Sequence, residues 1–269
     1  MKLIAIAHLK GGVGKSTTAV NVADLAAGAG RHTLLADLDA QGSAGYLLGV
    51  DSGSGGPSAK DVARGRKSAV GSVVDTGRPN LDLLPGSLSF RKLPQLIADH
   101  KDGPEALRSL LGRLGRSYDL VVADVPAGLN LESETILRTA DLVLSPVVPA
   151  PLALESFSVL CEFVDRKTGG KKRPPVPVIG FWAMVDRRRK LHRELVDGDR
   201  SSAWRDRPTL QDRIIPVVIP YASVVERMSA ERRPLSEIPR GGAAMTAYRD
   251  LWRAVSDRIG LSGAHPNDR

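Results

Sequence analysis

The stretch Lys10-Gly11-Gly12-Val13-Gly14-Lys15-Ser16-Thr17 decides the fold of this chain. The apolar run at residues 3–7 before it is typical of a buried strand, and residues 18–27 after it are typical of a helix that ends at Gly28 and Gly30. A strand, a glycine-rich loop and a helix in this order favour a phosphate-binding loop over an ordinary tight turn. Glycines let backbone N–H groups curl around phosphate oxygens, and the helix N-terminus adds partial positive charge. We therefore expect Lys15 to reach the β- and γ-phosphates of a nucleotide and Ser16 to ligate Mg²⁺.

The composition limits the class of protein. A chain of 269 residues with 42% hydrophobic residues has enough apolar mass for one large α/β domain or two small ones. No apolar stretch approaches the roughly 20 residues that span a bilayer, and the first strand follows Met1 too closely for a signal peptide. Cys161 is the only cysteine, which excludes an internal disulfide and a multi-cysteine iron–sulfur site. We expect a cytoplasmic protein in which Cys161 is a buried small hydrophobe.

Apolar strands alternate with helices along most of the chain. A polar loop is expected at 75–80, an amphipathic helix at 104–115, and the remaining strands at residues 33–38, 81–84, 120–123, 142–144, 178–184 and 214–219. Continuous apolar strands between helices indicate a mostly parallel sheet covered on both faces. The predicted fold is a single-domain, doubly wound α/β P-loop NTPase over residues 1–262, with a short polar tail at 263–269.

The last predicted helix, at about 243–260, has a broad apolar face. Asp250 and Asp257 interrupt this face, and it has no dense row of lysines. Those features favour a terminal helix docked on the core over a membrane-binding tail.

Two acidic motifs complete the predicted nucleotide site. Asp37 and Asp39 stand at the C-terminal end of the second strand, and Asp124 ends the apolar strand that begins at Leu120. The carboxyl ends of parallel strands form the ligand-binding edge of such a sheet. An Asp at this place is the expected Mg²⁺-side carboxylate of a P-loop NTPase. An isolated Asp at a strand end more often caps a loop, but three motifs in order favour the nucleotide site.

With these motifs the chain resembles the ParA family of ATPases, within a larger group that includes MinD and nitrogenase iron protein. The resemblance extends over nearly the whole chain and implies ATP and Mg²⁺ as cofactors. Lys10 resembles the signature lysine that crosses an ATP-sandwich dimer to the partner's nucleotide. Asp39 resembles the carboxylate that orients the hydrolytic water. The implied catalytic residues are Lys10, Lys15 and Asp39, the implied metal-side residues are Ser16, Asp39 and Asp124, and the implied nucleotide contacts are Gly11, Gly12, Val13, Gly14, Lys15, Ser16, Thr17 and Asp37.

The resemblance also covers the segment 219–227, which implies that Pro220 and Val225 line an adenine pocket. Three positions depart from the family pattern. His8 stands where Asn is frequent, and Ala40 and Ala127 stand where Pro is frequent. No departure removes a charged group, but each leaves the subfamily and the hydrolysis rate open. Larger plasmid members of the family carry a DNA-binding domain before the phosphate loop. Because the loop begins at residue 10 in this sequence, we expect that domain to be absent.

The net charge of +8 indicates either a polyanionic partner, nucleic acid or an anionic membrane, or a surface that simply carries many arginines, and charge alone does not decide between them. The ParA resemblance implies an ATP-dependent homodimer that binds non-specific DNA, is nucleoid-associated in its ATP state, and is stimulated by a ParB-like or cargo-adaptor protein. Such a protein partitions or positions DNA or another intracellular cargo. The basic residues assigned to DNA lie in two C-terminal blocks that could instead be solvated helix faces: Arg187, Arg189 and Arg193, then Arg227, Arg232, Arg233 and Arg240.

Three other functions fit the same scaffold. A MinD-like membrane ATPase would need a basic amphipathic tail, and residues 262–269 are short and polar. A metabolic ATP-dependent ligase or amidase usually lacks the basic blocks. A bacterial tyrosine kinase would have a tyrosine-rich tail, and no tyrosine follows Tyr248. We therefore expect no stable membrane association.

Overall fold

The computed structural model describes residues 1–50, 56–170, 174–197 and 208–261. An eight-stranded sheet crosses the molecule in the order β3-β4-β2-β5-β1-β6-β7-β8. All neighbouring strands pair in parallel except β3 with β4. The strands are β1 Lys2–Ile6, β2 Thr33–Asp37, β3 Val74–Arg78, β4 Leu81–Leu84, β5 Leu120–Asp124, β6 Leu142–Val147, β7 Val178–Val185 and β8 Ile214–Pro220. The predicted doubly wound, mostly parallel fold is confirmed.

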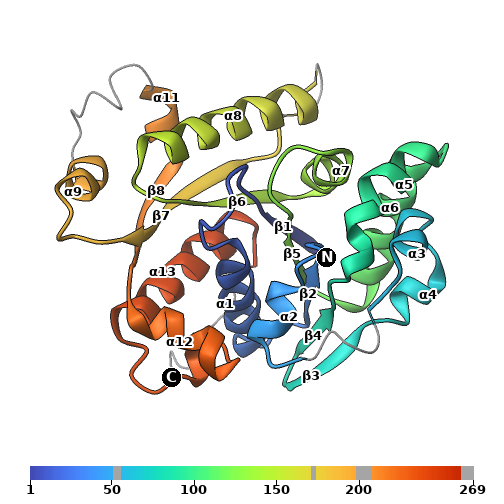
Figure 1. Ribbon diagram of the computed structural model, residues 1–269, viewed down its shortest axis with the longest axis horizontal. Helices are drawn as coiled ribbons and strands as arrows, with labels where there is room; N and C mark the ends of the chain where they lie inside the picture. The colour runs from blue at the N-terminus through green and yellow to red at the C-terminus, as the bar shows by residue number, and fades with distance from the viewer. Residues whose placement is uncertain (51–55, 171–173, 198–207, 262–269) are drawn as a thin grey trace.

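Helices cover both faces of this sheet (Figure 1). They are α1 Lys15–Gly28, α2 Ser43–Leu47, α3 Ala59–Ala63, α4 Lys67–Val70, α5 Leu93–Asp99, α6 Gly103–Leu114, α7 Leu131–Thr139, α8 Pro151–Thr168, α9 Lys190–Asp197, α11 Pro208–Gln211, α12 Ser223–Glu231 and α13 Gly242–Arg258. Side chains of α1, α2, α12 and α13 share one buried cluster, and those of α3 and α5–α8 share the other. The polar tail predicted at 263–269 lies outside the described residues.

The strands form where the sequence is continuously apolar because both faces of the sheet are covered. Every residue of β1 from Leu3 to Ile6, and every residue of β2 and β5, is buried. Their side chains alternate between the two helical layers, so Leu3 and Ile4 join different clusters. This burial on both faces removes the polar alternation of a half-exposed strand.

Residues 74–78 differ from the prediction, because the expected polar loop at 75–80 is mostly strand β3. Asp75 and Gly77 are exposed, while Val74, Thr76 and Arg78, which alternate with them, are half-buried. This strand is antiparallel and lies at the edge of the sheet. An edge strand needs only one paired side and one covered face, so a polar sequence suffices.

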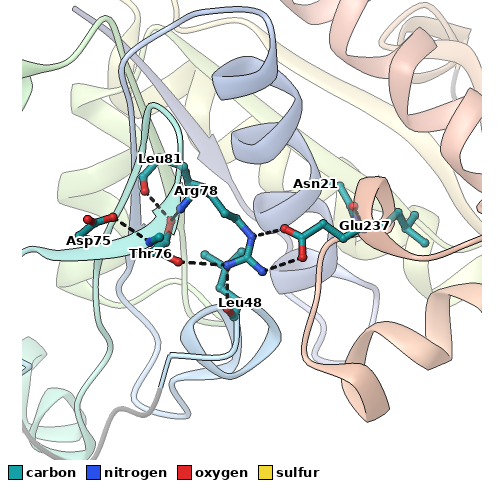
Figure 2. Close-up of polar contacts among 9 residues, drawn as sticks. Asn21, Leu48, Asp75, Thr76, Arg78, Leu81 and Glu237 are labelled. Atoms are coloured by element: carbon teal, nitrogen blue, oxygen red, sulfur yellow. Dashed lines mark hydrogen bonds and ion pairs between the residues drawn. The ribbon is translucent and has the colours of Figure 1, made fainter.

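Arg78 ties this edge strand to the C-terminal part of the chain, as Figure 2 shows. Its guanidinium donates to both carboxylate oxygens of Glu237, at 2.6 and 3.2 Å, and to the Leu48 carbonyl at 2.9 Å. Asn21 of α1 accepts the Leu235 N–H at 3.0 Å. Two parallel hydrogen bonds fix both the distance and the relative orientation of the Arg78 guanidinium and the Glu237 carboxylate. The segment at 235–237 is thereby held against α1, β3 and the end of α2.

The final helix α13 docks on the core, as its interrupted apolar face predicted. Met245, Tyr248, Leu251, Trp252 and Val255 are all buried, and they pack against α1 and β8. Cys161 is also buried, in α8, and burial raises the pKa of its thiol to about 12. Among the described residues no helix is both long and apolar enough to cross a membrane.

The docking of α13 predicts a stability difference between its two faces. Leu251→Ala removes a fully buried side chain and should lower the free energy of unfolding by about 2–5 kcal/mol. Arg253→Ala removes a largely exposed side chain and should change it by less than about 0.5 kcal/mol. Urea unfolding followed by circular dichroism measures both. Equal effects would mean that α13 does not pack as described.

Candidate functional site

The phosphate loop turns between β1 and α1 through two glycines in left-handed conformation. Gly12 has φ +74° and Gly14 has φ +94°, values that side-chain-bearing residues rarely adopt. Gly14 is also the N-cap of α1. The loop therefore brings its backbone N–H groups and the start of α1 to the carboxyl edge of the sheet, where anions are stabilised.

A cavity of about 700 Å³ lies against this loop, and it is named the polar cavity because most of its lining residues are glycines or carry polar side chains. Asp39 and Gln41 from the loop after β2 form part of its wall, together with Ala127 from the loop after β5. The phosphate loop contributes Gly11, Gly12, Gly14, Lys15, Ser16 and Thr17. The structure thus brings most of the residues predicted to contact phosphate around one space.

A smaller, mainly apolar cavity of about 220 Å³ continues from the first. Pro220 and Val225, the residues predicted for an adenine pocket, both line it, as does Val13. Gly14, Thr17, Leu47, Met184 and Ser229 line both cavities. An apolar compartment joined to a polar one has the shape that a base and its phosphates require.

Met184, at the junction of the two cavities, was not predicted as a site residue. Its φ is +55°, although it is not a glycine, and its Cε lies 3.6 Å from the position of a Cβ on Gly14. A side-chain-bearing residue in this conformation costs of order 1–3 kcal/mol and persists where its surroundings hold it. No sequence pattern distinguishes this methionine from the other residues of an apolar strand.

Asp37 is fully buried and holds the loop that follows β2. Its Oδ2 accepts the N–H groups of Ala44 at 2.9 Å and Gly45 at 3.2 Å, and its Oδ1 accepts that of Asp39 at 3.2 Å. Burial raises the pKa of Asp37, and these backbone N–H groups oppose the shift. Asp37 therefore fixes the start of α2 and places Asp39, whose Oδ1 accepts the Gln41 N–H at 2.9 Å, at the cavity wall.

Asp124 lies beside Asp37 because the two residues are register partners in β2 and β5. It is fully buried, and neither carboxylate oxygen accepts a hydrogen bond of regular geometry. Burial raises the pKa of Asp124 well above its usual range, and the charge of Asp37 raises it further, while the Ser16 hydroxyl and the charge of Lys15 lower it. A buried carboxylate with two unpartnered oxygens requires a cationic or hydrogen-bonding partner.

A Mg²⁺ ion fits this arrangement. It prefers oxygen ligands, keeps several waters, and is usually held by one or two carboxylates or hydroxyls together with substrate phosphates. Among the described residues no group of three or more His, Cys, Asp or Glu side chains could hold a metal ion. Ser16 and Asp124 would face such an ion, with Asp39 at the cavity wall.

Lys10 and Lys15 occupy opposite environments. Lys15 is buried and lines the polar cavity, whereas Lys10 is exposed and lines neither cavity. Lys15 can therefore act on a nucleotide in its own protomer. From its exposed position, Lys10 is available to a neighbouring molecule.

Glu132, in the first turn of α7, is a further buried carboxylate that sequence reasoning missed. It is 2% exposed, and its Oε1 has no hydrogen-bond partner. Burial raises the pKa of Glu132 to about 8, and the charge of Asp39 adds to the shift. An acidic residue at a helix start usually matches the helix dipole at the surface, so its sequence position did not reveal its burial.

The structure separates the arginines that were predicted to bind DNA. Arg187, Arg189 and Arg193 are exposed at and before α9, and Arg227 is exposed on α12. Because the Tyr221 N–H donates to the Val185 carbonyl at 2.9 Å, the segments after β7 and β8 begin side by side. Arg232 instead stacks on the Tyr46 ring at 4.8 Å. Arg233 and Arg240 are exposed in the segment between α12 and α13.

Comparison with known proteins identifies the family of this chain. Residues 1–172 match a family model described as an AAA domain. The chain is 30% identical over 197 residues to the chromosome partitioning protein ParA of Myxococcus xanthus, covering 73% of this chain and 69% of that protein. The chain belongs to the ParA family of P-loop ATPases.

Two further proteins are similar to this chain over almost all of its length. The ParA of Caulobacter vibrioides is 28% identical over 261 residues, which is 96% of this chain and 95% of that protein. The ATP complex of a Cyanothece McdA variant has the same fold, with a TM-score of 0.76 and 22% identity over 98% of both chains. Membership of the ParA family therefore rests on the sequence, and the McdA likeness supports the fold.

The raised pKa of Glu132 predicts a pH-dependent cost in stability. Because its pKa is higher in the folded than in the unfolded protein, the carboxyl destabilises the fold increasingly as pH rises from about 4.5 to about 8. Glu132→Gln should therefore raise Tm by about 2–10 °C at pH 8 and by less at pH 5. Differential scanning fluorimetry of the nucleotide-free protein measures the difference in Tm between the variant and the wild type at each pH. Glu105→Gln, at an exposed glutamate, is the control. A Tm difference that became smaller as pH rises would contradict the raised pKa of Glu132.

Proposed function

We propose that this protein is a Mg²⁺-dependent ATPase that dimerises with ATP and partitions or positions DNA or another intracellular cargo. The observation that supports this most strongly is the pair of joined cavities at the phosphate loop, with the buried carboxylate of Asp124 near the Ser16 hydroxyl and without a hydrogen bond of regular geometry. The base would lie between Met184, Pro220 and Val225. The phosphates would lie against the N–H groups of the loop and against Lys15.

In phosphoryl transfer, each of these side chains would have a different role. Lys15 and the loop N–H groups stabilise negative charge on the phosphates, and Asp39 orients the attacking water. A bound Mg²⁺ would neutralise charge on the phosphate oxygens. Asp37 acts on the nucleotide only through the loop that it holds. Because these groups are preorganised, they need little rearrangement during the reaction.

Lys10 would complete the site of a second protomer. It is exposed and lies outside both cavities of its own chain. A cation delivered across a dimer interface can stabilise developing charge on the phosphates, as an arginine finger does. Hydrolysis by one protomer alone is then slow, and a ParB-like or cargo-adaptor protein accelerates it in the dimer. ATP thereby switches the protein between a dimer that binds a surface and a monomer that leaves it.

Non-specific DNA is the surface that we propose for the dimer. The exposed arginines at α9 and α12 pair with carboxylates or with backbone. Arg187 pairs with the exposed Asp197 at 2.8 Å, whereas Arg189 and Arg227 pair with the half-buried Asp186 and Glu231. An ion pair whose arginine is exposed contributes little, so a phosphate can replace the carboxylate. Arg232 is the exception, since its stacking on Tyr46 favours a structural role. We expect the ATP-bound protein to be nucleoid-associated in the cytoplasm.

Retention on non-specific duplex DNA with ATP, ADP or no nucleotide tests the DNA proposal. Retention should require ATP and fall steeply between 50 and 200 mM salt, about 10³-fold or more for six phosphate contacts. Changing Arg187, Arg189 and Arg193 together to Gln should abolish it and leave ATP binding intact. The matched control changes three exposed residues by the same total charge: Lys60 on α3, Arg64 directly after α3, and Lys67 on α4.

Equal loss in both triple variants would indicate that overall charge, and not the α9 surface, retains DNA. No retention by the wild-type protein in any state, with hydrolysis intact, would contradict DNA binding. In that case, ATP-dependent flotation with anionic liposomes would support the membrane alternative, and its absence would favour a metabolic enzyme.

Substitution of Lys10 tests the crossing lysine. Lys10→Ala should lower the rate of ATP hydrolysis by about 100-fold or more, because the partner's site loses its cation. Affinity for ADP should change little, since Lys10 lines neither cavity of its own protomer. Phosphate release and titration with a fluorescent nucleotide measure the two quantities. Hydrolysis at the wild-type rate would contradict the role.

A further inference from the structure

His8 makes an unusual turn at the front of the phosphate loop. It lies two residues beyond β1, and its side chain is 1% exposed. Its Nδ1 accepts the backbone N–H of Lys10 at 3.0 Å. A side-chain acceptor that binds the N–H two residues later forms an Asx turn when the residue is Asn or Asp. His8 builds the same turn with a ring nitrogen.

This hydrogen bond tethers the front half of the loop to the protein, in addition to the packing of the buried Val13 side chain. Of the backbone N–H groups of residues 9–13, all within the described structure, only that of Lys10 donates to another protein atom. Before it, the Ala7 N–H still donates to Leu144 in the sheet at 3.1 Å, and after it, the Thr18 N–H donates to Gly14 at 2.9 Å. The N–H groups of residues 11–13 therefore remain available for an anion, while that of Lys10 points back into the protein.

The tether persists over the physiological pH range. Nδ1 can accept a hydrogen bond only while the imidazole is neutral, with its proton on Nε2. Burial lowers the pKa of His8 to about 4, and the charges of Lys15 and Lys10 lower it further, while backbone groups of Ala153 and Lys10 act in the opposite direction. The ring is therefore neutral at pH 7, and the acceptor is present.

We propose that His8 is a positioning residue that fixes the direction in which Lys10 leaves the loop toward a second copy of this chain. The inference rests on the proposed role of Lys10 in that dimer. A lysine that must reach another protomer's phosphates loses less freedom on association when its backbone is already fixed. The side chain of Lys10 is exposed, so the His8 hydrogen bond is the contact that fixes this residue.

Two substitutions of similar polarity distinguish the loss of the hydrogen-bond acceptor of His8 from the loss of its ring. The oxygen of Asn lies the same number of bonds from Cα as Nδ1, whereas the oxygen of Gln corresponds to Nε2. His8→Asn should keep hydrolysis within about twofold of wild type. His8→Gln should lower kcat by about tenfold to 100-fold, the cost of a displacement of about 1 Å, with little change in Tm or ADP affinity. Wild-type kcat in H8Q would overturn the proposal.

A double-mutant cycle shows whether His8 acts through Lys10. In the K10A background, H8Q should cause no further loss of kcat, because the group that it positions is already absent. Additive losses would overturn the proposal and indicate a general effect on the loop. If H8Q lowers Tm by more than about 10 °C, H8A takes its place in the cycle, with the same expected results.

The same cycle distinguishes a failure of the proposed role of Lys10 from a failure of the proposed role of His8. Wild-type hydrolysis by K10A would contradict the proposed function, and the His8 inference with it. Impaired K10A together with a fully active H8Q would overturn the role of His8 alone.

Discussion

The site depends on two carboxylates that the sheet forces together. The parallel register of β2 and β5 makes Asp37 and Asp124 neighbours, and both are fully buried. Two like charges in such a place are unfavourable unless each has partners. Three backbone N–H groups supply them for Asp37 and so fix the loop after β2. Asp124 has no such partners, and that asymmetry makes its position suited to a cation that arrives with the nucleotide.

The same loop leads into contacts with the C-terminal part of the chain. Tyr46, in α2, lies under the guanidinium of Arg232, and the Leu48 carbonyl accepts a hydrogen bond from Arg78, which also binds Glu237. The wall of the phosphate cavity and the segment that follows α12 are therefore one packed unit. Arg232, predicted from charge alone to bind DNA, is part of this unit.

The sequence was sufficient to predict the sheet and the phosphate loop. Buried parallel strands are continuously apolar, and the loop has fixed residue types at fixed spacing. The edge strand β3 was missed because an edge needs little apolar character. Pro220 and Val225 were placed at the apolar cavity through family resemblance, and no periodicity would have found them.

Other features depend on tertiary contacts and could not be read from the sequence. The burial of Glu132 follows from how α7 packs. Met184 has a left-handed backbone and lies at the junction of the two cavities, and neither property is visible in an apolar strand sequence. The contacts of the basic residues could not be predicted from the sequence either. Arg187 pairs with Asp197, ten positions later, while Arg232 stacks on Tyr46 from the other half of the chain.

The mass of the wild-type protein in solution, measured by light scattering with Mg-ATP, with Mg-ADP and without nucleotide, tests the central claim most directly. The account predicts a doubling of the mass with Mg-ATP only, because only then does the polar cavity hold the γ-phosphate that Lys10 of a second copy would contact. A mass independent of nucleotide, in protein that binds and hydrolyses ATP, would contradict it.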